Sequence, residues 1–328
     1  MPLAQVSPDF VSLVGIPLDL GASVRGAALG PAAFRIAGLA AHLEGLGHTV
    51  RDHGDLSPLA TPLMPDPSSR TLGKHDREIA AWTRAIHDRA LDAFALGGLP
   101  LFMGGDHSLS MGTVTAAASH AQRTGRKLVV LWLDAHADYN TPATSPSGNM
   151  HGMSVACLTG DPALRNLLPG RSVPAIAHRD FHLFGLRSID RDERAALAAD
   201  GLNCVDMRMI DEFGVSALLR QLLGGLDPAT THLHVSFDID LIDPALAPGV
   251  GTPVQGGLTY REAHLIMELL HESGLVRSID IVELNPFLDD RGKSAHLAVD
   301  LIGSLFGRTV LAKAKPAADH LISQDNAA

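Results

Sequence analysis

Short aliphatic runs alternate with longer amphipathic segments along most of this chain. The short runs are rich in Val, Ile and Leu and have the length of β-strands; they predict strands at 11–16, 49–53, 99–103, 128–133, 181–186, 203–206, 232–237 and 278–284. The run LVVLWL at 128–133 is apolar on both faces. Such a run is typical of a parallel strand that helices cover on both sides.

The segments between these strands have apolar residues at helical spacing. They predict helices at 31–47, 74–96, 107–121, 215–223, 260–271 and 294–305. The first helix would begin with Pro31 and end with Gly47, the usual asymmetry of helix ends. Because strands and helices alternate over the whole chain, we predict an α/β fold, a three-layer α/β/α arrangement around a central, mainly parallel sheet of about eight strands.

The same alternation predicts a single domain over residues 1–328. The segment 57–70 contains four prolines and two adjacent serines, a composition that would also suit a domain linker. The strand–helix rhythm resumes unchanged after it, so we interpret it as a long surface loop. We expect residues 313–328 to form a frayed C-terminal tail.

Composition excludes several classes of function. The net charge is −10 and no basic run offsets it, which argues against a nucleic-acid partner. The first ten residues lack the basic and apolar regions of a signal peptide, and no window approaches the ~20 apolar residues of a membrane span. The two cysteines, Cys157 and Cys204, form neither a metal motif nor a disulfide framework. We therefore expect a soluble cytoplasmic protein without a membrane partner.

Metal-ligand residue types cluster where three of the predicted strands end. The sequence DAHAD at 134–138 follows one strand, DID at 238–240 follows another, and GGDHS at 104–108 follows a third. In an extended backbone, residues i, i+2 and i+4 point to the same side, so the Asp and His residues of each motif should converge. In open α/β sheets, ligands bind beyond the carboxyl ends of strands. The three motifs therefore predict one shared site.

A single aspartate after a strand is usually a turn former or a helix N-cap. Four carboxylates in two alternating sets are different, because their mutual repulsion would raise their pKa values unless cations balance them. Two divalent ions would do so. Oxygen-rich sites with imidazole and without thiolate suit Mn²⁺, and Fe²⁺, Co²⁺ and Ni²⁺ are compatible with the same ligands. Bridging carboxylates would hold the ions roughly 3.5–4 Å apart, where a shared water loses a proton near neutral pH and becomes a nucleophile.

Two further histidines, His232 and His234, alternate along the strand at 232–237. They precede the carboxyl end of that strand, so we interpret them as buried or helix-covered residues and not as metal ligands.

At these motifs the sequence resembles the ureohydrolases, a family that includes arginases, agmatinases and formiminoglutamases. The resemblance covers nearly the whole chain and is carried by GGDHS (104–108), DAHAD (134–138), SFDIDLIDP (236–244) and SIDIVELNP (278–286). It implies that Asp134 and Asp238 bridge two Mn²⁺ ions per subunit. The complete ligand set implied by the resemblance is His107, Asp134, Asp138 and Asp238 for one ion, and His136, Asp134, Asp238 and Asp240 for the other.

The resemblance also implies catalytic roles. Glu283 would pair with the substrate guanidinium, and a planar cation does favour a carboxylate partner. His151 would protonate the leaving amine. Asp138, besides binding a metal, would accept a hydrogen bond from the bridging hydroxide.

The polar segment at 140–152 resembles the arginase loop that binds the amino-acid end of the substrate. By this resemblance the α-carboxylate would be bound by Asn140, Ser145 and Ser147, and the α-ammonium by Asp190 and, through water, Glu193. Agmatine lacks the carboxylate, so an agmatinase has no use for such donors.

Together these features predict a homo-oligomeric hydrolase, a trimer or hexamer by the resemblance, that cleaves the guanidinium group of L-arginine to L-ornithine and urea through a metal-bridging hydroxide. An agmatinase or another guanidino-acid hydrolase with the same metal site is the nearest alternative. A non-catalytic relative is a second alternative, but such a protein would be expected to have lost metal ligands, and all six positions are filled here.

Overall fold

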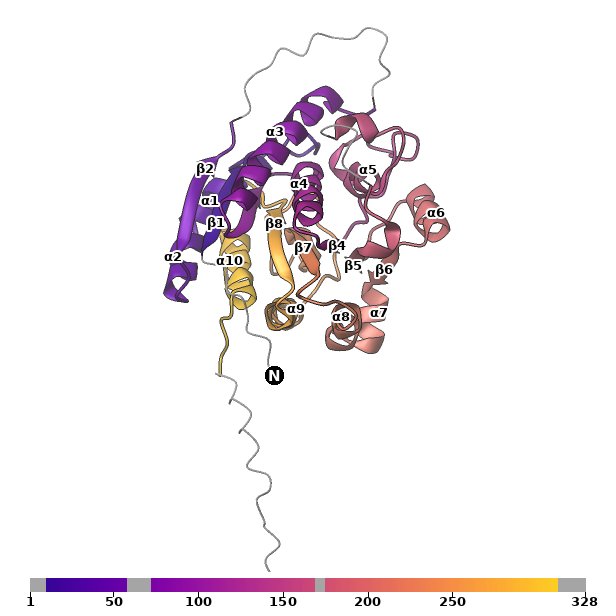
Figure 1. Ribbon diagram of the computed structural model, residues 1–328. Helices are drawn as coiled ribbons and strands as arrows, with labels where there is room; N and C mark the ends of the chain where they lie inside the picture. The colour runs from indigo at the N-terminus through magenta and orange to yellow at the C-terminus, as the bar shows by residue number, and fades with distance from the viewer. Residues whose placement is uncertain (1–9, 58–71, 169–174, 312–328) are drawn as a thin grey trace, which may run out of the picture.

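The computed structural model describes residues 10–57, 72–168 and 175–311. In these residues one sheet of eight strands forms the middle layer, in the order β2-β1-β3-β8-β7-β4-β5-β6. Every pair of neighbouring strands is parallel, and helices cover both faces (Figure 1). The predicted three-layer α/β/α fold is confirmed. The strands are β1 (Val11–Ile16), β2 (Val50–Asp55), β3 (Leu99–Gly104), β4 (Lys127–Leu133), β5 (Phe181–Leu186), β6 (Asn203–Asp206), β7 (Thr231–Asp238) and β8 (Val276–Val282).

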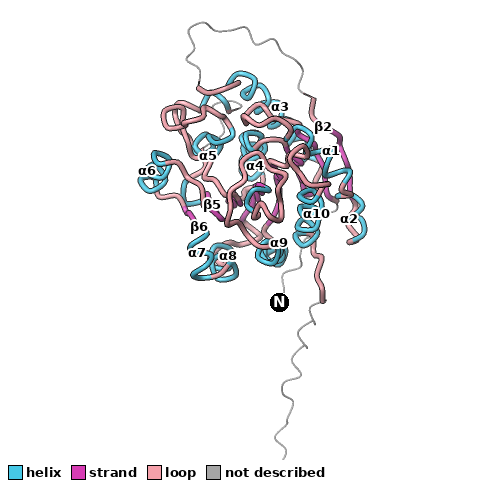
Figure 2. The backbone as a smooth tube through the Cα atoms, turned by 180° about the vertical axis from the view of Figure 1, so that it is seen from behind, coloured by secondary structure: helices cyan, strands magenta, loops and turns pink. Residues whose placement is uncertain are grey.

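The helices divide between two buried apolar clusters, one on each face of the sheet. One face packs against α1 (Gly30–Ile36), α2 (Leu39–Gly45), α7 (Met207–Phe213), α8 (Val215–Leu223), α9 (Tyr260–Ser273) and α10 (Lys293–Leu305). The other face packs against α3 (Asp76–Ala95), α4 (Ser110–Arg123), α5 (Ser154–Thr159) and α6 (Arg191–Asp200). Figure 2 shows that loops lie over the middle of the molecule when it is seen from behind.

The central strands are buried on both sides, as the apolar run at 128–133 predicts. In β4, Val129 and Leu131 belong to one apolar cluster, while Val130 and Trp132 belong to the other. All four side chains are at most 1% exposed. Polar residues can therefore reach solvent only at the strand ends.

The prediction of one continuous helix at 31–47 is wrong, because the structure has two helices there, α1 and α2. The break lies at Gly38, whose φ is +85°, a left-handed conformation that glycine adopts at little cost. The short helices α5, α6 and α7 were not predicted. Asp190 and Glu193 form a capping box at the start of α6.

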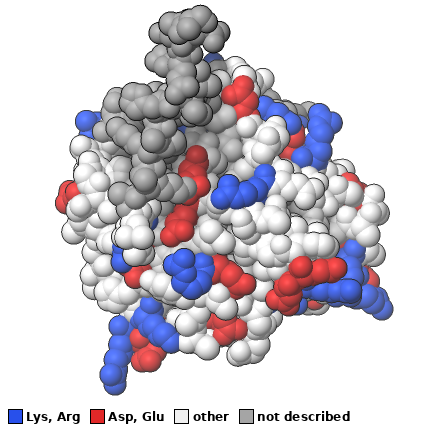
Figure 3. Space-filling view, turned by 90° about the horizontal axis from the view of Figure 1, so that it is seen from below, with Lys and Arg blue, Asp and Glu red and all other residues white. Residues whose placement is uncertain are grey.

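None of the helices in the described part of the chain is long and apolar enough to cross a membrane. On the face drawn in Figure 3, Lys and Arg side chains are interspersed with Asp and Glu, without a continuous basic patch. Residues 58–70 of the predicted surface loop and the predicted tail at 313–328 lie outside the described residues.

Candidate metal centre and substrate pocket

Four strands in the middle of the sheet carry the predicted motifs. The strands β3, β8, β7 and β4 are consecutive neighbours, so their carboxyl ends lie side by side at one edge. The motif at 104–108 follows β3, Glu283 follows β8, the motif at 238–240 begins at the end of β7, and the motif at 134–138 follows β4. The strand order therefore brings segments about 180 residues apart in sequence into one site.

The glycines of the first motif allow the chain to approach a neighbouring segment closely. A Cβ atom on Gly105 would overlap the carbonyl oxygen of Leu18. Asp106, the next residue, accepts hydrogen bonds from the backbone N–H groups of Gly21 (2.8 Å) and Ser108 (3.0 Å). Asp106 therefore shapes the turn, and His107 is the residue that faces the site.

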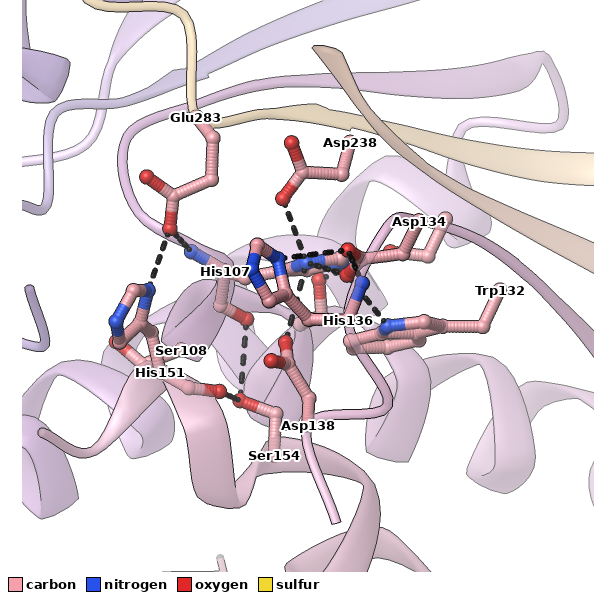
Figure 4. A network of polar contacts seen from close by, with 12 residues as sticks. His107, Ser108, Trp132, Asp134, His136, Asp138, His151, Ser154, Asp238 and Glu283 are labelled. Atoms are coloured by element: carbon pink, nitrogen blue, oxygen red, sulfur yellow. Dashed lines mark hydrogen bonds and ion pairs between the residues drawn. The ribbon is translucent and has the colours of Figure 1, made fainter. Parts of the chain in front are cut away.

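His107 lies among three carboxylates. Its Nδ1 atom is 3.0 Å from Asp134 Oδ2, 3.1 Å from Asp238 Oδ2 and 3.3 Å from Asp138 Oδ2 (Figure 4). His107 Nδ1 and Asp138 Oδ2 are both buried and make no hydrogen bond to the described residues. Three carboxylate oxygens thus lie close to His107 Nδ1, and two of these four atoms have no hydrogen-bond partner in the described part of the chain, an arrangement that a cation would satisfy.

His136 lies at the centre of a second group. Its Nδ1 atom is 3.0 Å from Asp240 Oδ2 and 3.5 Å from Asp134 Oδ1. Asp134 therefore offers one oxygen to each histidine. The ligand atoms of His107, Asp134 and Asp238 lie within 4.8 Å of one another, as do those of Asp134, His136 and Asp240.

Neighbouring groups hold these ligands in place. The ring of His107 stacks on Trp132 with centroids 3.9 Å apart, and the indole N–H of Trp132 donates to Asp134 Oδ2 at 3.0 Å. The backbone N–H of His136 donates to Asp134 Oδ1 at 2.7 Å, and that of Asp240 donates to Asp238 Oδ1 at 2.7 Å. The alternation that points these side chains together also lets each carboxylate bind the backbone two residues later.

The electrostatics of the cluster favour a bound cation. Burial, with the charge of neighbouring carboxylates, raises the pKa of Asp138 and of Asp238 well above the usual range. Burial would lower the pKa of His136, but Asp240 and Asp134 raise it to about 12. Divalent cations would relieve the repulsion among these carboxylates. The residues therefore fit a metal centre.

Two residues of the site have strained backbones. Asp138 has φ = +49° and Glu283 has φ = +64°, in the left-handed region that non-glycine residues seldom adopt. Such strain, of order 1–3 kcal/mol per residue, is commonly found where a fold positions functional groups. The sequence did not predict this strain.

Glu283 and His151 form a buried pair next to the cluster. Glu283 Oε1 lies 2.9 Å from His151 Nδ1 and accepts the backbone N–H of His107 at 2.9 Å. Its other oxygen, Oε2, makes no hydrogen bond within the described chain. Burial would lower the pKa of His151, but Glu283 raises it to about 9. His151 therefore carries a proton at neutral pH in this arrangement.

A cavity of about 270 Å³ opens above the cluster. Most of the residues predicted to bind substrate border it, and the loop at 140–152 forms one of its walls. The lining residues are His136, Asp138, Asn140, Ser145, Pro146, Ser147, Asn149, His151, Gly152, Ser188, Asp190, Glu193, Asp238 and Thr252. Glu283 is not among them, but it lies next to His151, which borders the cavity.

The predicted residues for the amino-acid end of a substrate also bind one another. Asn140 Nδ2 donates to Asp190 Oδ2 at 2.9 Å, which connects the loop to the start of α6. The carboxylate of Glu193 accepts the backbone N–H groups of Tyr139 (2.8 Å) and Asp190 (3.1 Å). Asp190 and Glu193 thus help to build this wall of the cavity.

Sequence reasoning missed several residues of this site. Asn149, Ser188 and Thr252 line the cavity, and Thr252 donates to Asp240 Oδ2 at 3.2 Å. Lys74 Nζ donates to Asn149 Oδ1 at 3.1 Å and places a cation beside the loop. Asn149 could have been found from its place in the polar loop. No sequence pattern connects Lys74 or Thr252 with the motifs.

Comparisons with known proteins identify the family of this chain. A family profile described as "Arginase family" matches residues 10–307. An arginase from Agrobacterium fabrum is 46% identical over 298 residues, covering 91% of each chain. An arginase from Brucella melitensis is 46% identical over 299 residues, covering 91% of this chain and 96% of its own. The crystal structure of Bacillus caldovelox arginase superimposes with a TM-score of 0.84 at 38% identity, covering 92% of this chain and 100% of that one.

Proposed function

The chain belongs to the arginase family, and on this premise we propose that it hydrolyses the guanidinium group of L-arginine to give L-ornithine and urea. The observation that carries the proposal is the convergence of two histidines and four aspartates at the carboxyl edge of the sheet, beneath a polar cavity. The relatives described above, with high identity over most of the chain, are named arginases.

We propose that two divalent ions occupy this centre, with Mn²⁺ as the expected metal and Fe²⁺, Co²⁺ and Ni²⁺ compatible with the same ligands. His107, Asp138 and the shared Asp134 and Asp238 would hold one ion, and His136 and Asp240 would complete the other site. When bound, such ions supply a water that deprotonates near neutral pH and a positive charge that stabilises the developing transition state. The two oxygens of Asp134, which face different histidines, support its assignment as a bridge.

Glu283 is proposed to orient the substrate guanidinium. A buried carboxylate next to the ligand cluster is a suitable partner for a planar cation, and Oε2 is available because the known hydrogen bonds of this side chain use Oε1. The contribution of Glu283 would be mainly positioning, since it would hold the reacting carbon at the metal centre. Asp138 would orient the attacking water through a hydrogen bond.

His151 is proposed to donate a proton to the amine that leaves. It borders the cavity and pairs with Glu283, so a guanidinium bound there would lie within reach of its ring. The raised pKa of about 9 keeps this imidazole protonated at neutral pH. A protonated donor at this place assists the cleavage of the carbon–nitrogen bond.

The polar wall of the cavity is proposed to bind the amino-acid end of arginine. The α-carboxylate would be bound by Asn140, Ser145 and Ser147, and the α-ammonium by Asp190 and Glu193. The ammonium group of Lys74 lies beside this wall, hydrogen-bonded to Asn149, and would attract an anionic group. Agmatine has no carboxylate, so agmatinase activity is less well supported.

We also propose that the chain forms a single cytoplasmic domain, as its strand–helix alternation and composition predict, and that it assembles into a trimer or hexamer, as the family resemblance implies. Mass measurement by light scattering would test the assembly.

The choice of substrate gives the direct test of the proposed function. With metal-loaded protein, kcat/KM for L-arginine is expected to exceed that for agmatine by about 10⁴-fold, because polar groups left unpaired by the wrong substrate produce discrimination of this order. Urea release measured on both substrates decides the question. A preference for agmatine would overturn the assignment of the 140–152 loop.

A Ser147→Ala variant tests the same assignment of the 140–152 loop. It should raise KM for L-arginine by about 10-fold or more, the usual effect of losing a hydrogen bond to a charged group, while kcat and the activity on agmatine change little. Equal losses on both substrates would show that Ser147 supports the loop and does not bind the carboxylate.

His151→Asn is expected to lower kcat for L-arginine by about 10²–10⁴-fold, the usual contribution of a general acid. His151 is not a proposed ligand, so two ions per chain should remain bound. Steady-state kinetics together with metal analysis of the variant test this. An unchanged kcat would remove the proton-donor role.

A further inference from the structure

A row of buried polar side chains extends from the metal-ligand cluster along the sheet, beneath α4. On β7 three polar residues alternate with apolar ones and so point to the same face. The neighbouring strand β8 and the helix α4 add two residues each. This buried polar row consists of His232, His234, Ser236, Ser278, Asp280, Ser110 and Thr113, and each side chain is at most 1% exposed. The proposed chemistry of the site uses none of them.

Asp280 accepts hydrogen bonds from three members of the row. Its Oδ2 atom lies 2.8 Å from the hydroxyl of Ser110, 2.8 Å from that of Thr113 and 3.1 Å from Nε2 of His234. The hydroxyls of Ser110 and Thr113 donate to this carboxylate oxygen, and because a carboxylate oxygen accepts, Nε2 of His234 donates to it as well. Its Oδ1 atom is buried and makes no hydrogen bond to the described residues. Asp280 is thus a fixed acceptor within the sheet.

The direction of the hydrogen bonds to Asp280 determines the direction of the hydrogen bonds that connect it to His107. Because Ser110 uses its hydrogen on Asp280, its oxygen accepts from Ser236, whose hydroxyl lies 3.2 Å away. The oxygen of Ser236 then accepts from Nε2 of His107 at 2.9 Å. Each hydroxyl has one hydrogen, so all the hydrogen bonds of this series donate in the same direction, from His107 towards Asp280. In the neutral imidazole the single hydrogen then lies on Nε2, and Nδ1 is left with a lone pair directed towards the carboxylates.

The other side of the row directs hydrogen bonds to the same carboxylate. His232 Nε2 lies 2.9 Å from the hydroxyl of Ser278, and that hydroxyl lies 2.8 Å from Nδ1 of His234. If Ser278 donates to Nδ1, the hydrogen of His234 lies on Nε2, as the bond to Asp280 requires. The two histidines that precede the end of β7 therefore have a structural function in this row.

We propose that Asp280 is a positioning residue of the metal centre: through Ser110 and Ser236 it holds the hydrogen of His107 on Nε2 and leaves Nδ1 free to bind a metal ion. Carboxylates that accept directly from metal-binding histidines act in this way, and their loss typically costs about 10–100-fold in metal affinity. Here two hydroxyls stand between the carboxylate and the histidine. The inference rests on the proposed metal centre and is independent of the substrate.

The test is a metal titration of the full-length protein. Wild type, Asp280→Asn and Ser110→Ala are loaded with Mn²⁺, equilibrated with increasing concentrations of a chelator, and analysed for bound metal per chain. Asp280→Asn removes the carboxylate charge with little change of side-chain shape. Ser110→Ala interrupts the series of hydrogen bonds while the carboxylate of Asp280 remains. Both variants should lose the ion held by His107 at a chelator activity about 10–100-fold lower than the activity at which wild type loses it. The ion held by His136 should stay bound.

Thr113→Val is the matched control, because it removes a hydrogen bond of the same length to Asp280 that does not lead to His107. Its metal affinity should stay within about threefold of wild type. If Thr113→Val weakens the same ion as much as Ser110→Ala does, or if Ser110→Ala binds both ions like wild type, the inference is overturned. Should Asp280→Asn not fold, Ser110→Ala and Thr113→Val decide alone. Wild-type protein that binds no ion would contradict the metal centre itself, an outcome distinct from the others.

Discussion

Replacing Asp134 with alanine is expected to remove metal and nearly all hydrolysis of L-arginine. Asp134 Oδ2 lies 3.0 Å from His107 Nδ1, and Oδ1 lies 3.5 Å from His136 Nδ1, so the change would remove a ligand from both ions. Residues that only support ligands typically contribute about 10–100-fold. The loss of a bridging ligand should therefore exceed this range. Metal content per chain and kcat/KM with added Mn²⁺ are the measurements.

Asp243→Ala is a suitable control for this change. Asp243 also follows β7, but within the described residues its carboxylate accepts hydrogen bonds from the backbone N–H groups of Ala245, Gly256 and Gly257 and from no other group. This variant should keep two ions and most of its activity. If Asp134→Ala also retained two ions, the bridging role would be wrong, even if activity were lost.

Much of the fold could be predicted because its patterns are local. The strands at 11–16, 181–186 and 203–206 have the predicted bounds, since each depends on a short run of apolar or β-branched residues. The division of the first predicted helix depends on a single glycine, Gly38, whose left-handed backbone the helical spacing did not reveal. The short helices between 154 and 213 were missed because they are too brief to show a period.

Part of the candidate site could likewise be predicted from local patterns, and part of it could not. The alternation of Asp134, His136 and Asp138 is written in the sequence, and so is that of Asp238 and Asp240, because side chains two residues apart share a side of an extended chain. The meeting of these groups with His107 depends on the strand order, in which β8 and β7 lie between β3 and β4. That order follows from long-range packing.

The buried polar row shows the limit of local patterns most clearly. His232 and His234 were interpreted as buried or helix-covered, and both are at most 1% exposed. Their connection to Asp280 exists only because β7 and β8 are neighbours in a register that pairs Ser236 with Asp280. The sequence separates these two residues by 44 positions, and no periodicity relates them.

Glu283→Gln is expected to lower kcat/KM for L-arginine by about 30- to 5,000-fold while both ions stay bound. The carboxylate is 3% exposed, and truncation of a buried, hydrogen-bonded charge pair costs 2–5 kcal/mol, which corresponds to this range at 1.36 kcal/mol per tenfold change. Glutamine can still accept the backbone N–H of His107, so the local fold should persist. It cannot supply the negative charge that would pair with the guanidinium.

The same substitution should change the pH dependence of kcat. Burial lowers the pKa of His151, and Glu283 is the main group that raises it. Without that charge the pKa of His151 falls, so the imidazole loses its proton at lower pH. The alkaline decline in kcat should therefore begin at a lower pH than in wild type. Glu262→Gln, which removes a capping carboxylate at the start of α9, should leave both kcat/KM and the pH profile unchanged. Loss of metal in Glu283→Gln would instead identify Glu283 as a ligand, and an unchanged kcat/KM with both ions bound would mean that the guanidinium pairs with another group.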